Sequence, residues 1–122
     1  MANKLMIFDD DKDILSICTF IFKRLGWEVS SSLNCNDIVN KVAAENPDVI
    51  LMDNWIPEEG GITATRLLKG HESLKQIPVI YFSANRDVEA LAREAGADSY
   101  IKKPFDLKEF ESMVTSLGNN RT

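Results

Sequence analysis

Thiol and imidazole groups are scarce in this sequence, which contains 2 cysteines and 1 histidine. Cys18 and Cys35 do not form a C-x-x-C pair, and two cysteines do not make a disulfide framework. No apolar run approaches the roughly 20 residues that cross a bilayer. The aspartates at residues 9–11 also interrupt the N-terminal apolar stretch before it could act as a signal peptide. We therefore expect reduced cysteines, a cytoplasmic location and no membrane partner.

Runs of basic residues are also absent. Lysine and arginine number 14 against 19 aspartates and glutamates, and the formal net charge is −5. Such a chain repels a phosphate backbone, so direct nucleic-acid binding is not expected. The remaining composition, 44% hydrophobic and 27% charged over 122 residues, is that of one globular domain. We expect a single domain over residues 1–122, with its ordered core at about 3–118 and no output domain.

Five short apolar segments alternate with five segments of helical spacing. The apolar segments are residues 4–8, 27–29, 49–52, 78–82 and 99–101. The intervening segments repeat apolar residues every three or four positions, as amphipathic helices do, over residues 14–25, 38–46, 62–69, 87–95 and 107–117. This alternation predicts a doubly wound α/β fold, in which one parallel sheet is covered by helices on both faces.

Particular residues are predicted to mark the ends and the inward faces of these helices. Asn36-Asp37 and an Asp106-x-x-Glu109 capping box are predicted to open helices. The predicted helix stops are Gly26, Pro47, Gly70 and Gly96. The predicted inward residues are Ile14, Ile17, Cys18, Ile21 and Leu25 in the first helix, Ile38, Val42 and Ala43 in the second, Val88, Leu91 and Ala92 in the fourth, and Leu107, Phe110, Val114 and Leu117 in the last.

Polar residues stand where the predicted strands end. Strand one ends in Asp9-Asp10, strand three in Asp53 and strand four in Ser83, and strand five leads to Lys103. In an open parallel sheet, ligands bind at the carboxyl ends of the strands, where the strand order reverses. We therefore expect these side chains to share one crevice.

Three carboxylates in one crevice repel one another unless a cation compensates for their charge. Mg²⁺ takes oxygen ligands and is typically held by one or two carboxylates plus a substrate phosphate. Asp10 and Asp53 are predicted to ligate it directly, and Asp9 to orient a metal-bound water. Lys103 can pair with Asp53 or with an incoming phosphoryl oxygen, and Ser83 can donate a hydrogen bond to that oxygen. Asp53 could then attack phosphorus without a catalytic base.

Taken together, these residues resemble the receiver domains of bacterial two-component response regulators. The resemblance covers nearly the whole chain. It rests on Phe8-Asp9-Asp10-Asp11, on residues 49–53 with Pro57 and Gly61 after them, on Ser83-Ala84, and on Tyr100-Ile101-Lys102-Lys103-Pro104-Phe105. It implies a flavodoxin-like (βα)5 fold with the strand order 2-1-3-4-5.

The resemblance also implies roles for individual residues. Asp53 would be phosphorylated by a partner histidine kinase or phosphotransfer protein. Mg²⁺, or Mn²⁺ in its place, would be bound by Asp9, Asp10, Asp53 and the backbone carbonyl of Trp55. The sequence departs from the commonest pattern at the bulky Trp55 and at Glu58-Glu59, beside the site. We expect the phosphorylation chemistry to survive both departures.

The same resemblance implies a switch rather than a conventional enzyme. Ser83 would be drawn toward the phosphoryl group, and Tyr100 would turn inward into the space that Ser83 vacates. The binding surface on the last two strand-helix units would change as a result, by the added charge and acceptor oxygens of the phosphoryl group. The downstream partner or output domain is left open, as is a phosphorylation-dependent homodimer.

The strongest enzyme alternative is a phosphatase of the haloacid dehalogenase type. Asp9-x-Asp11 after an apolar strand matches the nucleophile and acid of that family. Three features count against it: Asp13 stands where Thr or Val usually completes the motif, a later acidic pair is missing, and 122 residues leave no cap domain. Asp11→Asn would inactivate such a phosphatase, whereas Asp53→Asn would block phosphorylation of a receiver.

Two further alternatives concern binding. Asp9-x-Asp11-x-Asp13 suggests a calcium loop, but Ile14 occupies its glycine position and Phe20 its bidentate glutamate position. A receiver-like chain could also serve only as a docking module that is never phosphorylated. The presence of all five site residues argues against that reading.

Overall fold

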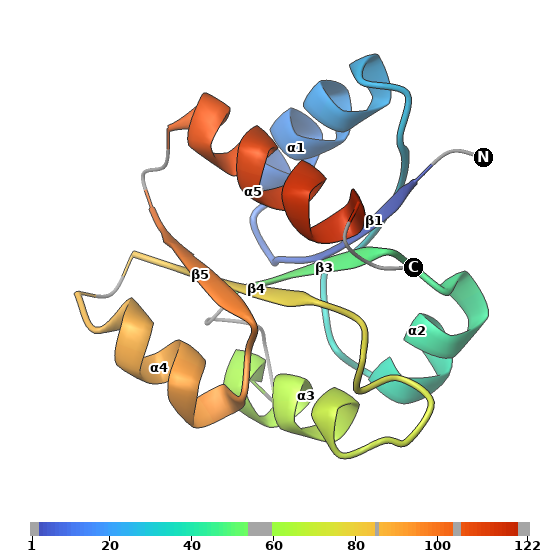
Figure 1. The fold of residues 1–122 in the computed structure, drawn as a ribbon, viewed down its shortest axis with the longest axis vertical. Coiled ribbons are helices and arrows are strands. Elements are labelled where there is room, and N and C mark those ends of the chain that lie inside the picture. Colours follow the sequence, from blue (N-terminus) through green and yellow to red (C-terminus); the bar gives the residue numbers. More distant parts are fainter. Residues whose placement is uncertain (1–2, 54–59, 85, 104–105, 120–122) are drawn as a thin grey trace.

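A five-stranded parallel sheet lies between two layers of helices in a computed structural model of the chain (Figure 1). The structure describes residues 3–53, 60–84, 86–103 and 106–119. The strands are β1 (Lys4–Phe8), β2 (Glu28–Ser32), β3 (Val49–Asp53), β4 (Val79–Ser83) and β5 (Ser99–Lys102). Their order is β2-β1-β3-β4-β5, and every neighbouring pair is parallel. The predicted doubly wound fold and its strand order are both confirmed.

The helices follow the strands in strict alternation. They are α1 (Lys12–Arg24), α2 (Ile38–Glu45), α3 (Gly60–Lys69), α4 (Val88–Ala95) and α5 (Leu107–Asn119). Helices α1 and α5 cover one face of the sheet, and α2, α3 and α4 cover the other (Figure 1). Within the described residues, no helix is long and apolar enough to span a membrane.

The core consists of two apolar clusters, one on each face of the sheet. Successive side chains of a strand point to opposite faces. Accordingly, Leu51 of β3 packs in the cluster with α1 and α5, while its neighbour Met52 packs in the cluster with α2, α3 and α4. Every residue of β3 and β4 is buried. Burial on both faces explains why these strands read as continuous apolar runs rather than as alternating ones.

Short polar contacts set several helix ends. The side chain of Asp11 accepts hydrogen bonds from Asp13 N (2.9 Å) and Ile14 N (3.4 Å) and so caps α1. Asp106 caps α5 in the same way through Lys108 N at 2.8 Å. The predicted stops at Gly26 and Gly96 are confirmed, and both adopt a positive φ (88° and 83°). A non-glycine residue adopts that backbone conformation only at a cost in free energy.

The prediction for the start of α2 is wrong in its detail. Asp37 occupies the N-cap position, but it has a φ of 56° and its side chain makes no hydrogen bond that caps the helix. The Asp37 carboxylate instead accepts a hydrogen bond from Asn40 Nδ2 at 2.8 Å. The left-handed backbone at Asp37 replaces the extended one that a capping side chain requires.

Several residues predicted to lie on inward helix faces are instead partly exposed to solvent. Ile17, Leu25 and Leu107 are 47%, 51% and 48% exposed, and Ala43 is exposed as well. Cys18, which was predicted to face inward, is fully buried, and so is Phe22. These two residues define the line along which α1 meets the sheet. One residue step turns a helix by 100°, so Ile17 lies well away from that line.

The second strand is displaced from its prediction. Trp27 precedes β2 and is buried, with its ring 5.4 Å from that of Phe22 in an edge-on contact. The strand itself continues through three serines to Ser32. It lies at the edge of the sheet, where a polar strand is tolerated, and its sequence therefore carries little of the apolar signal on which the prediction depended.

Candidate functional site

Strand alternation brings four side chains to one face at the carboxyl end of the sheet. The Leu51 and Ile101 side chains pack on the side of α1 and α5. The residues two positions further along are Asp53 and Lys103, so they continue on that side. Phe82 also packs there, directly opposite Asp53 in the register of β3 and β4. Asp9 follows β1 on the same parity, and its backbone N–H donates to Ser32 O at 3.2 Å.

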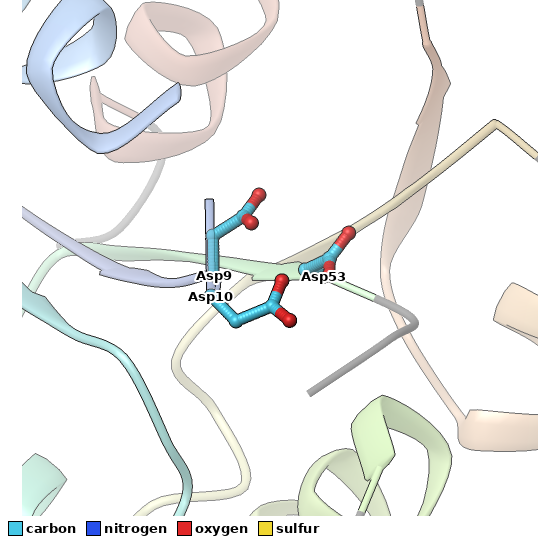
Figure 2. Close-up of side chains that lie close together, drawn as sticks. All are labelled: Asp9, Asp10 and Asp53. Atoms are coloured by element: carbon cyan, nitrogen blue, oxygen red, sulfur yellow. The ribbon is translucent and has the colours of Figure 1, made fainter. Parts of the chain in front are cut away.

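Three carboxylates meet in this crevice, as predicted. Asp9 is fully buried and Asp53 is 3% exposed, while Asp10 is exposed. One oxygen of each carboxylate lies within 4.8 Å of the others, and Figure 2 shows Asp9 and Asp10 beside Asp53. Such a set of hard oxygen ligands suits a small divalent cation. The Asp9 carboxylate is also held by Asp11 N, which donates to Oδ1 at 2.9 Å.

Lys103 supplies a positive charge among these carboxylates. Its Nζ donates to Asp53 Oδ1 at 2.8 Å and to Asp9 Oδ2 at 3.2 Å. The predicted pairing of Lys103 with Asp53 is therefore present. One ammonium facing three carboxylates leaves the crevice with net negative charge, so a divalent cation would be attracted to it.

Burial and nearby charges shift the pKa values of Asp9 and Lys103. Burial raises the pKa of Asp9, and the nearby charge of Asp53 raises it further, against the lowering effect of the Asp11 N–H and Lys103. Burial alone would lower the pKa of Lys103, but its hydrogen bond with Asp53 and the charges of Asp53 and Asp9 outweigh that effect and raise it. Lys103 therefore stays an ammonium ion across the physiological pH range.

Ser83 and Tyr100 lie on the other face of the sheet. Ser83 ends β4 and is 1% exposed. Tyr100 pairs in register with Tyr81, which packs in the cluster with α3 and α4. The Tyr100 side chain is 39% exposed at this edge of the sheet. The two residues thus share a face, and it is opposite to the face that carries Asp53 and Lys103. The expected place of Ser83 in the same crevice as the carboxylates, and the movement of both residues on phosphorylation, therefore stay predictions.

Several predicted residues cannot be placed in the site. Trp55 and Glu58-Glu59 fall outside the described residues, as do Pro104 and Phe105.

Two further residues singled out in the sequence are described. Cys18 is confirmed as a core residue, and burial raises the pKa of its thiol to about 12. His71 follows α3, and its Nδ1 lies 3.2 Å from Ser73 Oγ.

Phe82 is a neighbour of the site that the sequence pattern did not predict. Its ring centroid lies 4.3 Å from Lys103 Nζ, and its side chain is fully buried. The signal was present in the alternation of β4, because the residue before Ser83 must face the side opposite to Ser83. Only the pairing of β4 with β3 and β5 places that side beneath Lys103.

Comparison with known proteins identifies the family and the fold. A family model described as the response regulator receiver domain matches residues 5–115. A protein described as a response regulator from Chloroflexus aurantiacus J-10-fl is 25% identical, with a TM-score of 0.90 and coverage of 98% of this chain and 99% of that one. The signal receiver domain of a signal transduction histidine kinase from Syntrophus aciditrophicus is 27% identical, with a TM-score of 0.89 and coverage of 98% and 92%.

The fold is shared more widely. The receiver domain of a sensor histidine kinase from Pseudomonas aeruginosa PAO1, whose structure has a magnesium ion coordinated in the active-site cleft, is 22% identical, with a TM-score of 0.88 and coverage of 98% and 99%. Receiver domains are signalling domains that interact with histidine kinases, not conventional enzymes. Since the family model spans most of the sequence, this chain belongs to the response regulator receiver domain family of two-component signalling.

Proposed function

We propose that Asp53 accepts a phosphoryl group from a histidine kinase or a phosphotransfer protein, in a reaction that depends on Mg²⁺. One observation carries the proposal: Asp53 is a buried carboxylate at the end of β3, held by Lys103 Nζ at 2.8 Å and grouped with Asp9 and Asp10. This arrangement combines a nucleophile with the charges that a transferring phosphoryl group needs around it.

The transfer would proceed by displacement at phosphorus. An oxygen of Asp53 forms the new O–P bond while the N–P bond of the donor phosphohistidine breaks, and the electron pair of that bond returns to the imidazole. Lys103 would neutralise charge on the phosphoryl oxygens, and Ser83 would donate a hydrogen bond to one of them after moving toward the phosphoryl group. Asp53 attacks as a carboxylate, so no proton has to be removed and no catalytic base is required.

The residues present fit a divalent cation. Carboxylate oxygens of Asp10 and Asp53 would ligate Mg²⁺ or Mn²⁺, and Asp9 would orient a metal-bound water. By the family resemblance, the backbone carbonyl of Trp55 would be a further ligand. A bound Mg²⁺ would neutralise the charge of the transferring phosphoryl group. The acidic cluster supports this assignment; the Pseudomonas relative with its magnesium ion shares the fold.

The consequence of phosphorylation would be a change of binding surface. Ser83 would move toward the phosphoryl group, and the half-exposed Tyr100 would turn inward beside it. Both residues lie on the face of the sheet that α3 and α4 cover, so the surface formed by α4, β5 and α5 would change. A downstream protein or output domain would bind the changed surface. Alternatively, a second copy of the chain would bind it and form a homodimer on phosphorylation.

Intact-mass spectrometry of the chain incubated with acetyl phosphate and Mg²⁺ tests this proposal. The wild type should gain the mass of one phosphoryl group, and the gain should disappear in EDTA and in Asp53→Asn. Asp11→Asn is the matched control, because asparagine retains the capping oxygen of α1 and Asp11 has no role in the transfer. Retention of the gain in Asp53→Asn, with the phosphoryl group on Asp9, would instead indicate phosphatase-like chemistry. An unmodified wild type would contradict the proposal and leave a docking module.

A further inference from the structure

The ammonium group of Lys103 lies over the face of an aromatic ring. Its Nζ is 4.3 Å from the centroid of Phe82, which is fully buried. Phe82 is opposite Asp53 of β3 in the sheet register and opposite Ile101 of β5. Phe82 therefore stands on β4 between the strand that carries Asp53 and the strand that leads to Lys103.

A lysine side chain needs such support to hold one position. Four methylene groups separate its ammonium from the backbone, and holding that stem still costs rotamer entropy. The two carboxylates attract Nζ from one direction, through Asp53 Oδ1 and Asp9 Oδ2. The negative face of an aromatic ring attracts a cation from another direction, and does so more strongly where water is excluded. An aliphatic residue would fill most of the same volume without that attraction.

We propose that Phe82 is a positioning residue for Lys103. Its ring holds the ammonium at the place where it meets Asp53 and where it would meet the oxygens of an incoming phosphoryl group. The kinetic consequence rests on the proposed function of Asp53, whereas the position of Lys103 can be measured without any phosphoryl donor.

The alternative is that Phe82 is only a core residue. It packs in the same cluster as Phe110 of α5, and shortening either side chain removes buried apolar surface. Phe110→Leu is therefore the matched control for Phe82→Leu. The ring of Phe110 packs edge-on against that of Phe22, at a centroid distance of 5.3 Å.

Proton NMR of the metal-free protein tests the contact itself. In the wild type, the ring current of Phe82 should move the ε-methylene protons of Lys103 upfield of those of the exposed lysines. The displacement should vanish in Phe82→Leu and persist in Phe110→Leu. Lys103 ε-protons at the same shift in the wild type and in Phe82→Leu would overturn the proposal.

The rate of phosphorylation by acetyl phosphate, at saturating Mg²⁺, tests the consequence. Loss of a desolvated cation–ring attraction predicts a rate about tenfold lower in Phe82→Leu, while Phe110→Leu should stay within about twofold of the wild type. Equal losses in the two variants would show a general packing effect and would count against the positioning role.

Fluorinated phenylalanines at position 82 provide a test that hardly changes the shape of the core. Each added fluorine draws charge from the ring face, so the phosphorylation rate should fall stepwise from one to three fluorines. The same series at position 110 should show no trend. A rate that does not change across the series at position 82 would also overturn the proposal. If the wild type takes no phosphoryl group at all, the proposed function fails, and the Lys103 ε-proton shifts alone decide the role of Phe82.

Discussion

Asp9 combines a buried charge with a proposed role at the metal site. Its carboxylate is fully buried, and burial raises its pKa above the ordinary value of 3.8. The ionised form is therefore less favourable in the folded chain than in the unfolded one. The free energy of unfolding falls as the pH rises through the folded-state pKa of Asp9, and the cost persists at neutral pH. A bound divalent cation would offset that cost.

Asp9→Asn should stabilise the metal-free protein at neutral pH, because asparagine keeps an oxygen for Asp11 N and removes the buried charge. A gain of about 1 kcal/mol would raise the Tm by about 4 °C in a domain of this size. The gain should shrink as the pH falls toward 3.8, since Asp9 then becomes protonated in the wild type as well. Thermal unfolding in EDTA at neutral and acidic pH measures both effects. A lower Tm for the variant at neutral pH would mean that the ion pair with Lys103 outweighs the cost of burial.

At the scale of secondary-structure elements, a second lysine joins three elements near the amino ends of β4 and β5, remote from the site. Lys69, the last residue of α3, donates from Nζ to Lys75 O (3.1 Å), Ile77 O (2.9 Å) and Asp98 Oδ2 (2.6 Å). The same Asp98 oxygen accepts from Val79 N at 2.8 Å. The end of α3, the start of β4 and the start of β5 are thus held by one ammonium.

Lys69→Met should lower the free energy of unfolding by about 2 kcal/mol, because it leaves carbonyl groups and a carboxylate without their charged donor. Lys75→Met is the matched control. Lys75 is 46% exposed and pairs with Glu72 at 3.3 Å, a contact of the kind that contributes less than about 1 kcal/mol. Urea denaturation of both variants measures the difference. Equal values would show that the Lys69 contacts contribute no more than a surface ion pair.

At the scale of the whole molecule, the proposed metal would link the site to the stability of the fold. The carboxylates come from β3 and from the end of β1, so they converge only in the folded chain. A ligand that binds the folded state alone raises stability by RT ln(1 + [L]/Kd), which is about 2.7 kcal/mol at a hundredfold excess over Kd.

Mg²⁺ should therefore raise the Tm of the wild type in a concentration-dependent manner. Asp10→Asn should abolish most of that rise, because Asp10 supplies one of the three grouped carboxylates. Asp13→Asn, an exposed substitution in the first turn of α1, should leave the rise intact and serves as the control. Differential scanning fluorimetry across a Mg²⁺ titration gives the comparison. The same rise in Asp10→Asn as in the wild type would place the ion elsewhere.

Much of the fold and the site could be predicted from local pattern. Strand and helix periods repeat within ten residues, so β1, β3, β4 and β5 were predicted to within about two residues at each end. Local pattern did not predict the bounds of the polar edge strand β2 or the exposure of Ile17, Leu25 and Leu107. Burial depends on which elements pack against one another. Asp9, Asp10, Asp53 and Lys103 were predicted to meet, because parallel strands end at one edge of the sheet.

The sequence by itself determined the order of elements and the aspartates that follow or end the strands, because each depends on residues close together in the chain. The tertiary structure alone decided that Phe82 lies beneath Lys103 and that Lys69 reaches Asp98. These contacts join residues 21 and 29 positions apart, across the β4·β5 register and from α3 to β5. Pairings of this kind depend on strand register and helix placement, which no local period encodes.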